Sequence, residues 1–253
     1  MNLTRSTVLI TGGSDGIGFS LAERFMRQGN TVIVCGRQEQ KLHEAQNQLP
    51  GLITRICDVT NEEDRKSLFK WVTTHHPEVN VLVNNAGILR RFELLETDAT
   101  NDWHYYGKEI TVNTEGPIHL SMMFAQYFSK KENGAIVNIT SGLAFTPDPY
   151  APIYSATKAA IHSFSVSLRH QLSETPVEVI EIAPPLVNTG DFSPGTVAVP
   201  VTEFIDAVFA GLRQGKYEIG YESTENSFRM SRDEIDKTVK NIFSKKNNQS
   251  FGD

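Results

Sequence analysis

The 253-residue sequence contains little cysteine and tryptophan, with two residues of each. Two cysteines cannot supply the dense disulfide framework of small secreted domains, and such scarcity is typical of a reducing compartment. Cys35 and Cys57 fall at the ends of two predicted neighbouring strands. We interpret them as small, partly buried side chains, and a redox-sensitive thiol pair is the alternative.

Excess positive charge and long apolar runs are also missing. Lysine and arginine number 24 against 30 acidic residues, a net charge of −6, which disfavours a nucleic-acid partner. No apolar run approaches the roughly 20 residues of a membrane span. The polar start, Met1 to Ser6, is unlike a signal peptide. We expect a cytoplasmic protein with no membrane span, and no metal site is predicted.

Short apolar, β-branched runs alternate with amphipathic stretches along the chain. Runs that are nearly continuous in hydrophobicity are typical of parallel strands covered on both faces. The alternation predicts an α/β fold: a Rossmann-like, doubly wound parallel β-sheet with helices on both faces, in a single domain. The predicted strands are Thr7–Thr11, Thr31–Cys35, Ile53–Cys57, Val79–Asn84, Ala135–Ser141, Val177–Ala183 and a short Tyr217–Gly220, and the predicted helices include Gly16–Arg27, Asn61–His75 and Val201–Gln214.

The end of the chain differs in composition from the rest. We assign residues 1–221 to the Rossmann-like domain, with a glycine- and proline-punctuated substrate loop at about 188–200 that suits a short lid. Residues 222–253 are polar and are interpreted as a C-terminal extension of the same domain. We favour a surface helix with a frayed end for the extension, and an interaction arm is the alternative.

A glycine-rich turn follows the first predicted strand, with the sequence Thr11-Gly12-Gly13-Ser14-Asp15-Gly16-Ile17-Gly18. Strand, glycine-rich turn and helix form the layout that binds a dinucleotide pyrophosphate. Glycine permits close backbone approach, and the helix N-terminus offers free N–H groups. The spacing is G-x-x-x-G-x-G instead of G-x-G-x-x-G. A tight turn whose glycines serve packing alone is the alternative.

The second predicted strand ends with Gly36 and Arg37, where dinucleotide sites distinguish their two cofactors. NAD sites place a carboxylate here for the ribose 2′-hydroxyl, and NADP sites use a cation for the 2′-phosphate. Gly36 supplies no acid and Arg37 supplies a guanidinium, so we predict NADP(H) in preference to NAD(H). Asp15 would oppose this preference if it pointed inward. Asp58, after the third strand, suits either the adenine amino group or a capping turn.

Tyr154 and Lys158 stand four residues apart, so on a helix they share one face. An ammonium beside a phenol favours the phenolate and lowers the tyrosine pKa from its reference of about 10. A phenol tuned in this way can exchange a proton with an alcohol or ketone oxygen. Tyr127 and Lys131 have the same spacing, so spacing alone does not identify the reactive pair.

With these residues placed, the chain resembles the short-chain dehydrogenase/reductase family up to about residue 220. The motifs that carry the resemblance occur in the family's order: the glycine turn, Asn84-Asn85-Ala86-Gly87, Asn113, Ser141, Tyr154-x-x-x-Lys158 and Pro184. Segments such as Pro184-Pro185-Leu186-Val187 further resemble a bacterial subgroup of that family named for DltE. The family usually has glycine at position 185, and proline there stiffens the segment and removes a backbone donor.

The resemblance implies roles for individual residues. Tyr154 would be the general acid/base, Ser141 would hydrogen-bond the substrate oxygen, and Lys158 would hold the nicotinamide ribose. Asn113 would orient a water in a proton relay. Tyr127 precedes the strand that bears Ser141, so the resemblance implies that it is not catalytic. The cofactor-binding residues implied by the motifs and the resemblance together are Gly12, Ser14, Asp15, Gly16, Ile17, Gly18, Arg37, Asp58, Val59, Asn85, Ala86, Gly87, Tyr154, Lys158, Pro184, Val187 and Thr189.

The resemblance implies an NAD(P)(H)-dependent oxidoreductase that interconverts a small-molecule carbonyl and an alcohol by hydride transfer. The alternatives are an NADP(H)-binding sensor or scaffold protein without turnover, and a lyase or epimerase of the same fold. A homodimer through the helices bearing Asn113 and Tyr154 is expected, and a tetramer is the alternative. The predicted substrate side comprises an apolar pocket and a charged rim: Leu143, Phe145, Leu186 and Phe192, with Arg90, Arg91 and Glu93.

Overall fold

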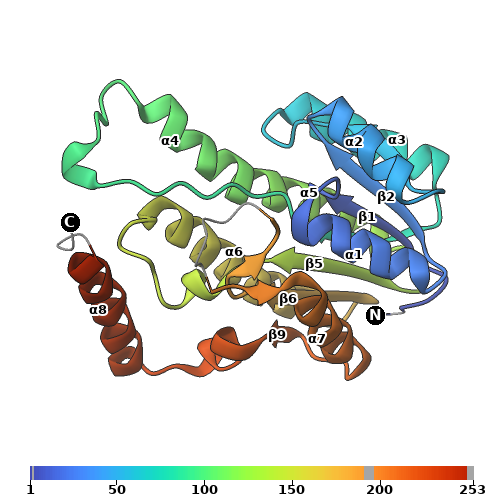
Figure 1. Cartoon of the computed structure of the whole chain (residues 1–253). Coiled ribbons are helices and arrows are strands. Elements are labelled where there is room, and N and C mark those ends of the chain that lie inside the picture. Colours follow the sequence, from blue (N-terminus) through green and yellow to red (C-terminus); the bar gives the residue numbers. More distant parts are fainter. Residues whose placement is uncertain (2, 191–196, 250–253) are drawn as a thin grey trace.

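The structure is a computed structural model that describes residues 1, 3–190 and 197–249, with side chains up to residue 244. Within these residues, seven parallel strands form one sheet in the order β3-β2-β1-β4-β5-β6-β9 (Figure 1). The strand order reverses between β1 and β4, which creates the crevice where doubly wound folds bind ligands. The strands are β1 (Thr7–Thr11), β2 (Thr31–Gly36), β3 (Ile53–Ile56), β4 (Val79–Asn84), β5 (Gly134–Ile139), β6 (Val177–Ala183) and β9 (Glu218–Gly220).

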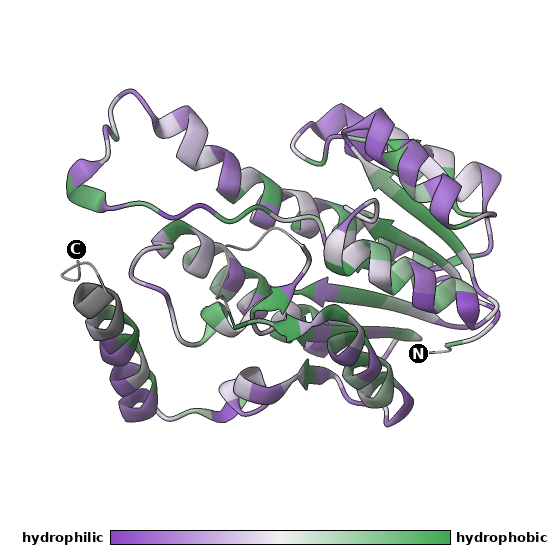
Figure 2. Ribbon diagram, viewed as in Figure 1, coloured by the Kyte–Doolittle hydropathy of each residue, from purple (hydrophilic) through white to green (hydrophobic). Residues whose placement is uncertain are grey.

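Helices cover both faces of this sheet, which confirms the predicted fold class. One core lies under α1 (Gly16–Arg27), α2 (Glu39–Gln48) and α7 (Val201–Arg213). The other core lies under α3 (Glu62–His75), α5 (Gly116–Phe128) and α6 (Pro152–Gln171). Figure 2 shows the consequence, with apolar strands inside and polar outer faces on the helices. Strands buried on both faces need apolar residues at every position, which explains their continuous hydrophobic runs.

Two strands end earlier than the sequence predicts. β5 ends at Ile139, because Ser141 accepts a hydrogen bond from Leu143 N and starts a short 3₁₀ turn, Gly142–Ala144. β3 ends at Ile56, before Cys57. Both corrections lie at carboxyl ends of strands, where side-chain capping competes with strand pairing.

A long helical element crosses the molecule from α4 (Trp103–Ile110) through a π-helical turn (Thr111–Glu115) into α5. A π-helical turn inside an α-helix is rare and is frequent at functional sites. The C-terminal extension holds two 3₁₀ turns and α8 (Arg232–Gln249). The Phe243 ring of α8 stacks on the Tyr150 ring, with 6.2 Å between the ring centres. The Phe228 and Phe145 ring centres lie 4.7 Å apart. The extension therefore packs beside the segment that follows Ser141.

The predicted substrate loop is bounded by two short paired strands, β7 (Val187–Asn188) and β8 (Val199–Pro200). Its central residues, Phe192 included, lie outside the described residues. Among the described residues, no helix is long and apolar enough to cross a membrane. The same residues contain no cluster of three or more His, Cys, Asp or Glu side chains that could hold a metal ion.

Candidate active site

The glycine turn lies directly against the end of β4. Gly12 and Gly16 have φ values of +63° and +55°, in the left-handed region that favours glycine. A Cβ atom on Gly12 would come within 2.9 Å of Ala86 Cα. Asn85 Nδ2 donates to the carbonyls of Thr11 and Gly12, both at 3.0 Å. These contacts hold the turn open toward the N-terminus of α1, whose N-cap is Asp15.

A cleft of about 450 Å³ opens over this turn. Most of the predicted cofactor-binding residues line it: Gly12, Ser14, Asp15, Gly16, Ile17, Arg37, Asp58, Val59, Asn85, Ala86, Gly87 and Thr189. The predicted residues that do not line it are Gly18, Tyr154, Lys158, Pro184 and Val187. A Cβ on Gly18 would meet Asn85 Nδ2 and Gly12 O at 2.4 Å, so this glycine serves close packing. Pro184 O accepts from Gly142 N at 3.1 Å, and Val187 is buried in β7.

Asp15 does not present an unbalanced charge to the cleft. Its carboxylate accepts from Gly16 N at 2.8 Å and from Lys41 Nζ at 2.6 Å. The Lys41 hydrogen bond lowers the pKa of Asp15, with burial opposing it. Lys41 lines the cleft beside Arg37, and the sequence analysis did not single it out. Its position in the first turn of the helix that follows Arg37 was the available signal.

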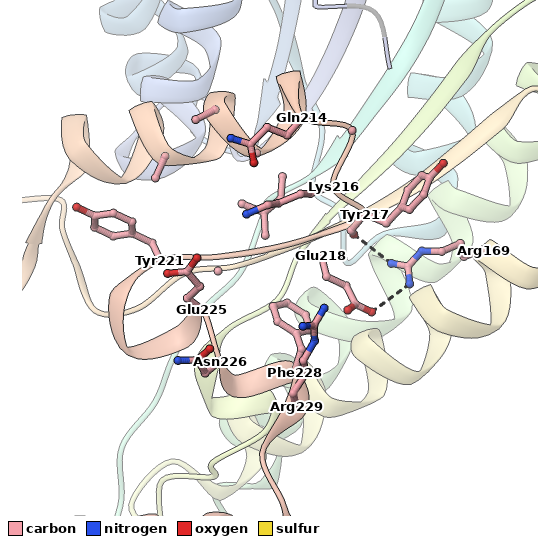
Figure 3. Close-up of a pocket in the computed structure, with 16 residues that line it drawn as sticks. Arg169, Gln214, Lys216, Tyr217, Glu218, Tyr221, Glu225, Asn226, Phe228 and Arg229 are labelled. Carbon is pink, nitrogen blue, oxygen red and sulfur yellow. Dashed lines mark hydrogen bonds and ion pairs between the residues drawn. The ribbon is translucent and has the colours of Figure 1, made fainter.

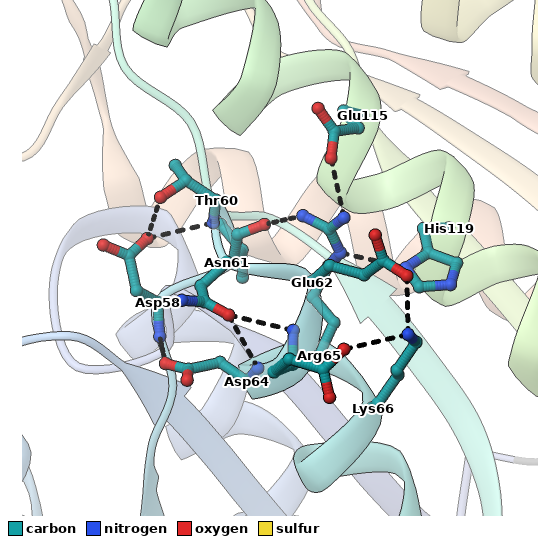
Figure 4. A network of polar contacts seen from close by, with 11 residues as sticks. Asp58, Thr60, Asn61, Glu62, Asp64, Arg65, Lys66, Glu115 and His119 are labelled. Atoms are coloured by element: carbon teal, nitrogen blue, oxygen red, sulfur yellow. Dashed lines mark hydrogen bonds and ion pairs between the residues drawn. The ribbon is translucent and has the colours of Figure 1, made fainter.

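A buried arginine, Arg65, ties the loop after β3 to the π-helical turn (Figure 4). Asp58 Oδ1 accepts from Thr60 N at 2.9 Å and from Thr60 Oγ1 at 2.8 Å. Asp58 is therefore a turn residue, and its proposed contact with adenine stays a prediction. Arg65 donates to Val59 O at 2.7 Å and pairs with Glu115, in the π-helical turn, at 2.7 Å.

Burial tends to raise the pKa of Asp58. The hydrogen bonds from Thr60, with the nearby charges of Lys108 and Arg37, lower its pKa overall. The carboxylate thus stays ionised at the end of the cleft that Arg37 borders.

Asn113 lies in the π-helical turn and is buried. Its Oδ1 accepts from Ile88 N at 2.9 Å, and its Nδ2 donates to Ile88 O at 2.8 Å and to Thr157 Oγ1 at 3.2 Å. A Cβ at Gly87 would lie 3.4 Å from Asn113 Oδ1 and 3.6 Å from Lys158 Nζ. The structure therefore brings the Asn113 and Lys158 side chains together beside Gly87, at the rim of the cleft.

Ser141 and Tyr154 meet at the same place from two different elements. Ser141 follows β5, and Tyr154 lies in the first turn of α6. The Ser141 side chain lies near enough to the phenol to lower the pKa of Tyr154. One turn along α6, Lys158 is buried and donates from Nζ to Ile139 O at 2.7 Å. All four predicted catalytic side chains thus converge on one region.

The pKa of Tyr154 corrects an expectation from the sequence. The spacing predicted a pKa lowered by Lys158, but burial raises the pKa of Tyr154 to about 12, with the Ser141 hydrogen bond opposing it. Lys158 Nζ lies 5.5 Å from the centre of the tyrosine ring and bonds to a backbone carbonyl instead. Burial also lowers the pKa of Lys158 to about 8. At neutral pH the site therefore holds a phenol beside an ammonium.

The pair with the same spacing lies in a different environment. Tyr127 donates from its hydroxyl to Pro77 O at 2.9 Å, and Lys131 donates to the same carbonyl. Lys131 Nζ lies 4.6 Å from the Tyr127 ring centre, closer than the 5.5 Å of the Tyr154 pair. Neither side chain of this second pair lines the cleft over the glycine turn. Spacing and distance alone therefore do not distinguish the two pairs.

Both cysteines are more deeply buried than predicted, with 0% and 2% exposure for Cys35 and Cys57. The hydrogen bond with Cys57, together with burial, raises the pKa of the Cys35 thiol well above its usual value. The thiolate is the reactive form of cysteine. The raised pKa therefore favours the interpretation of these residues as packed side chains.

A second, larger cavity of about 720 Å³ lies between α7, β9 and the turns that follow β9 (Figure 3). Arg169 spans one side, donating to Glu218 and to Tyr217 O, both at 3.2 Å. No predicted catalytic or cofactor-binding residue lines this cavity. Volume alone therefore does not identify the active site.

Residues 6–194 match the model of the short chain dehydrogenase family. The chain belongs to this family. A relative described as an uncharacterised oxidoreductase, DltE of Bacillus subtilis, is 43% identical over 98% of this chain and 100% of its own length. The NADP-dependent 3-hydroxy acid dehydrogenase YdfG of Escherichia coli is 31% identical over 74% of each chain.

Solved short-chain dehydrogenases share the fold. One from Burkholderia cenocepacia, in complex with NADP, superposes with a TM-score of 0.81 at 24% identity, covering 94% of this chain and 99% of the other. One from Burkholderia phymatum, in complex with NAD, gives 0.79 at 22% identity over 95% and 93%. The resemblance inferred from the motifs is confirmed, and the protein is an NAD(P)-dependent oxidoreductase of this family.

Proposed function

We propose that this short-chain dehydrogenase interconverts a carbonyl and an alcohol with NADP(H), and that Tyr154 transfers the proton on oxygen. One observation carries the proposal. The Tyr154 phenol lies near the Ser141 side chain, which lowers its pKa, and Lys158 Nζ lies 5.5 Å from the centre of the Tyr154 ring, beside Gly87 at the rim of the cleft. A phenol that can donate a proton, with a serine hydroxyl beside it, suits a substrate oxygen that gains or loses negative charge during the reaction.

The cleft suits a dinucleotide phosphate. Its glycine turn has two left-handed glycines at the start of α1, where free N–H groups and the helix dipole favour an anion. Arg37 and Lys41 add positive charge, and Lys41 neutralises Asp15. When bound, the nicotinamide supplies or accepts the hydride. We infer that Arg37 and Lys41 favour the 2′-phosphate of NADP(H).

The protein's own residues would handle the proton. With a pKa of about 12, Tyr154 is a phenol at neutral pH and can donate its proton to a carbonyl oxygen. Ser141 would hydrogen-bond the same oxygen. Lys158, with a pKa of about 8, is about nine-tenths protonated at pH 7 and would stabilise the phenolate that remains. Asn113 anchors Ile88 and Thr157 around this site.

Tyr154→Phe tests the proton role. It removes the proton donor while keeping the ring, so we expect kcat to fall by about 10²- to 10⁴-fold with NADPH affinity unchanged. Tyr127→Phe is the matched control, because it removes a hydroxyl from the pair of equal spacing and should leave kcat unchanged. A Tyr154→Phe protein with wild-type kcat would refute the mechanism. Tight NADPH binding with no turnover across a broad carbonyl panel would favour a sensor or scaffold.

Arg37→Glu tests the cofactor preference. Reversing this charge at the end of β2 should weaken NADPH binding more than NADH binding, because only NADPH carries the 2′-phosphate. Isothermal titration with both cofactors measures the ratio of their Kd values. Equal loss for both cofactors would contradict the assignment. The matched control is Arg55→Glu on the neighbouring strand, because Arg55 does not line the cleft.

The oligomeric state and the substrate class are inferred from the exposed surface and from the relatives. We propose a homodimer through α5 and α6, where Met122 is 52% exposed on α5. Light scattering coupled to size-exclusion chromatography would measure the mass, and a monomer at all concentrations would contradict it. The substrate is a small carbonyl or alcohol, consistent with the oxidoreductase descriptions of the relatives.

A further inference from the structure

We propose that Glu109 is a positioning residue of the active site: a buried counter-charge that keeps Lys158 cationic and fixes the segment from Ile88 to Arg90. Its catalytic meaning rests on the proposed function, but its electrostatic role does not. Neither the sequence motifs nor the family resemblance pointed to it. A carboxylate directly after Lys108 would be expected at the surface. The Glu109 side chain nevertheless has 0% exposure.

Glu109 and Asn113 act on one segment from successive turns of the same helix. Glu109 Oε1 accepts from Arg90 N at 3.0 Å. Asn113 accepts from Ile88 N and donates to Ile88 O, at 2.9 and 2.8 Å. Together they bind alternate residues of the chain that leaves Gly87. The rim of the cleft is therefore held by a charged group as well as by the amide that the family motif predicts.

The second carboxylate oxygen of Glu109 lacks a hydrogen-bond partner among the described residues. A buried carboxylate with an unsatisfied oxygen is costly unless positive charge lies near it. Two cations lie near enough to lower the pKa of Glu109: Arg90 from the bound segment and Lys158 from α6. The Arg90 guanidinium is turned toward Tyr105, 3.8 Å from that ring's centre. Lys158 is thus the buried cation on this side.

The charges around the site determine the sign of the effect. Burial raises the pKa of Glu109, with Arg90 and Lys158 opposing it. Burial lowers the pKa of Lys158, and Glu109 opposes that change. Burial, and to a smaller degree Glu109, raises the pKa of Tyr154, whereas Ser141 and Arg91 lower it. Removing the Glu109 charge should therefore lower the pKa of both Lys158 and Tyr154.

Glu109→Gln tests this role, since it removes the charge and keeps an acceptor for Arg90 N. The first measurement needs no substrate. The protein is labelled with ¹³C at tyrosine Cζ and studied by NMR. The Tyr154 resonance is the one missing from Tyr154→Phe, and its chemical shift is followed from pH 8 upward. We expect the Glu109→Gln midpoint to move down by about one pH unit, because Glu109 raises the pKa of Tyr154; one unit corresponds to about 1.4 kcal/mol of interaction between the two charges. An unmoved midpoint overturns the proposal.

The second measurement is the pH profile of kcat/KM, which should shift downward by the same amount. Glu174→Gln is the matched control, because it removes one negative charge from an exposed position and should shift neither profile. If the Tyr154 midpoint moves and no substrate is turned over, the proposed function fails while the role of Glu109 stands. If turnover is found and the profile does not move, the role of Glu109 fails.

A second variant covers the case in which Glu109→Gln does not fold. Glu109→Gln with Lys158→Met removes both charges of the buried pair. Because the single variant leaves an uncompensated ammonium in the interior, the double variant should fold where the single one does not, or should unfold at a higher urea concentration where both fold. A double variant no more stable than Glu109→Gln overturns the pairing of Glu109 with Lys158.

Discussion

Replacing Arg65 with methionine should weaken the fold and the cofactor site together. The Arg65 side chain is only 2% exposed, although it carries a full charge. Its guanidinium donates to Val59 O at 2.7 Å and to His119 Nδ1 at 3.0 Å, and it pairs with Glu115 at 2.7 Å (Figure 4). It thereby joins a residue that lines the cleft to the turn that bears Asn113. Methionine keeps the apolar stem and removes every donor.

The magnitude follows from which partners are buried. The Val59 carbonyl would lose its charged donor in the interior, which costs about 1–3 kcal/mol. The Glu115 side chain is 56% exposed, so its pairing contributes only about 0–1 kcal/mol after solvent screening. With the His119 hydrogen bond, we expect the free energy of unfolding to fall by about 2–4 kcal/mol. The Kd for NADPH should rise, since the Asp58–Val59 turn loses its anchor.

Urea unfolding followed by circular dichroism measures the first effect, and NADPH titration measures the second. Lys66→Met is the control. Lys66 lies beside Arg65 on α3 and forms ion pairs with Glu62 and Glu63, at 2.6 and 3.0 Å, but these ion pairs are exposed to solvent. It should leave the urea midpoint unchanged. A loss below about 0.5 kcal/mol for Arg65→Met, within the range of ordinary surface substitutions, would refute the reasoning that burial decides the value of this network.

Three further perturbations test other parts of the structure. Gly18→Ala should cost about 1–3 kcal/mol by overpacking, because its Cβ would meet Gly12 O at 2.4 Å; a variant with unchanged thermal midpoint would contradict this. The Glu181 hydrogen bond raises the pKa of His162, with burial opposing it. His162 should therefore stabilise the protein below about pH 6.5 and lose this contribution as pH rises through the higher folded pKa, so His162→Gln should lower the thermal midpoint more at pH 6 than at pH 9. Phe243→Ala removes the stack on Tyr150 and should change KM for substrate while leaving the Kd for NADPH unchanged; a change confined to NADPH binding would exclude α8 from the substrate side.

The strands were predictable because burial on both faces leaves little choice of residue. Five of the predicted strands, which form β1, β2, β4, β5 and β6, contribute residues to both cores. The ends were harder to predict: Ser141 follows the residues that form β5, yet its hydroxyl accepts from Leu143 N and starts a turn instead of extending the strand. The π-helical turn at Asn113 was not predicted, because it is a single turn of five residues and shifts the apolar periodicity only locally.

Charged residues of the candidate site were predictable only where a known motif assigns a function to their position in the sequence. Arg37 was found because the end of the second strand is a defined place in dinucleotide folds. Lys41 was missed because it lies in a polar, mostly exposed helix, and Glu109 because its burial depends on segments far away in the sequence. The local sequence therefore identifies the chemical group of a side chain, but it does not show whether that group is buried or exposed to solvent.

Solvent is also what separates Tyr154 from Tyr127. Both have a lysine four residues later, and the ammonium is in fact nearer to Tyr127. In water that charge is screened, whereas around Tyr154 burial raises the phenol pKa to about 12 and lowers that of Lys158 to about 8. This pair therefore starts in the acid form, in which, under the proposed mechanism, the phenol would give a proton to a carbonyl oxygen. Alcohol oxidation instead needs the phenolate, so each added positive charge near Tyr154 should favour that direction more than reduction.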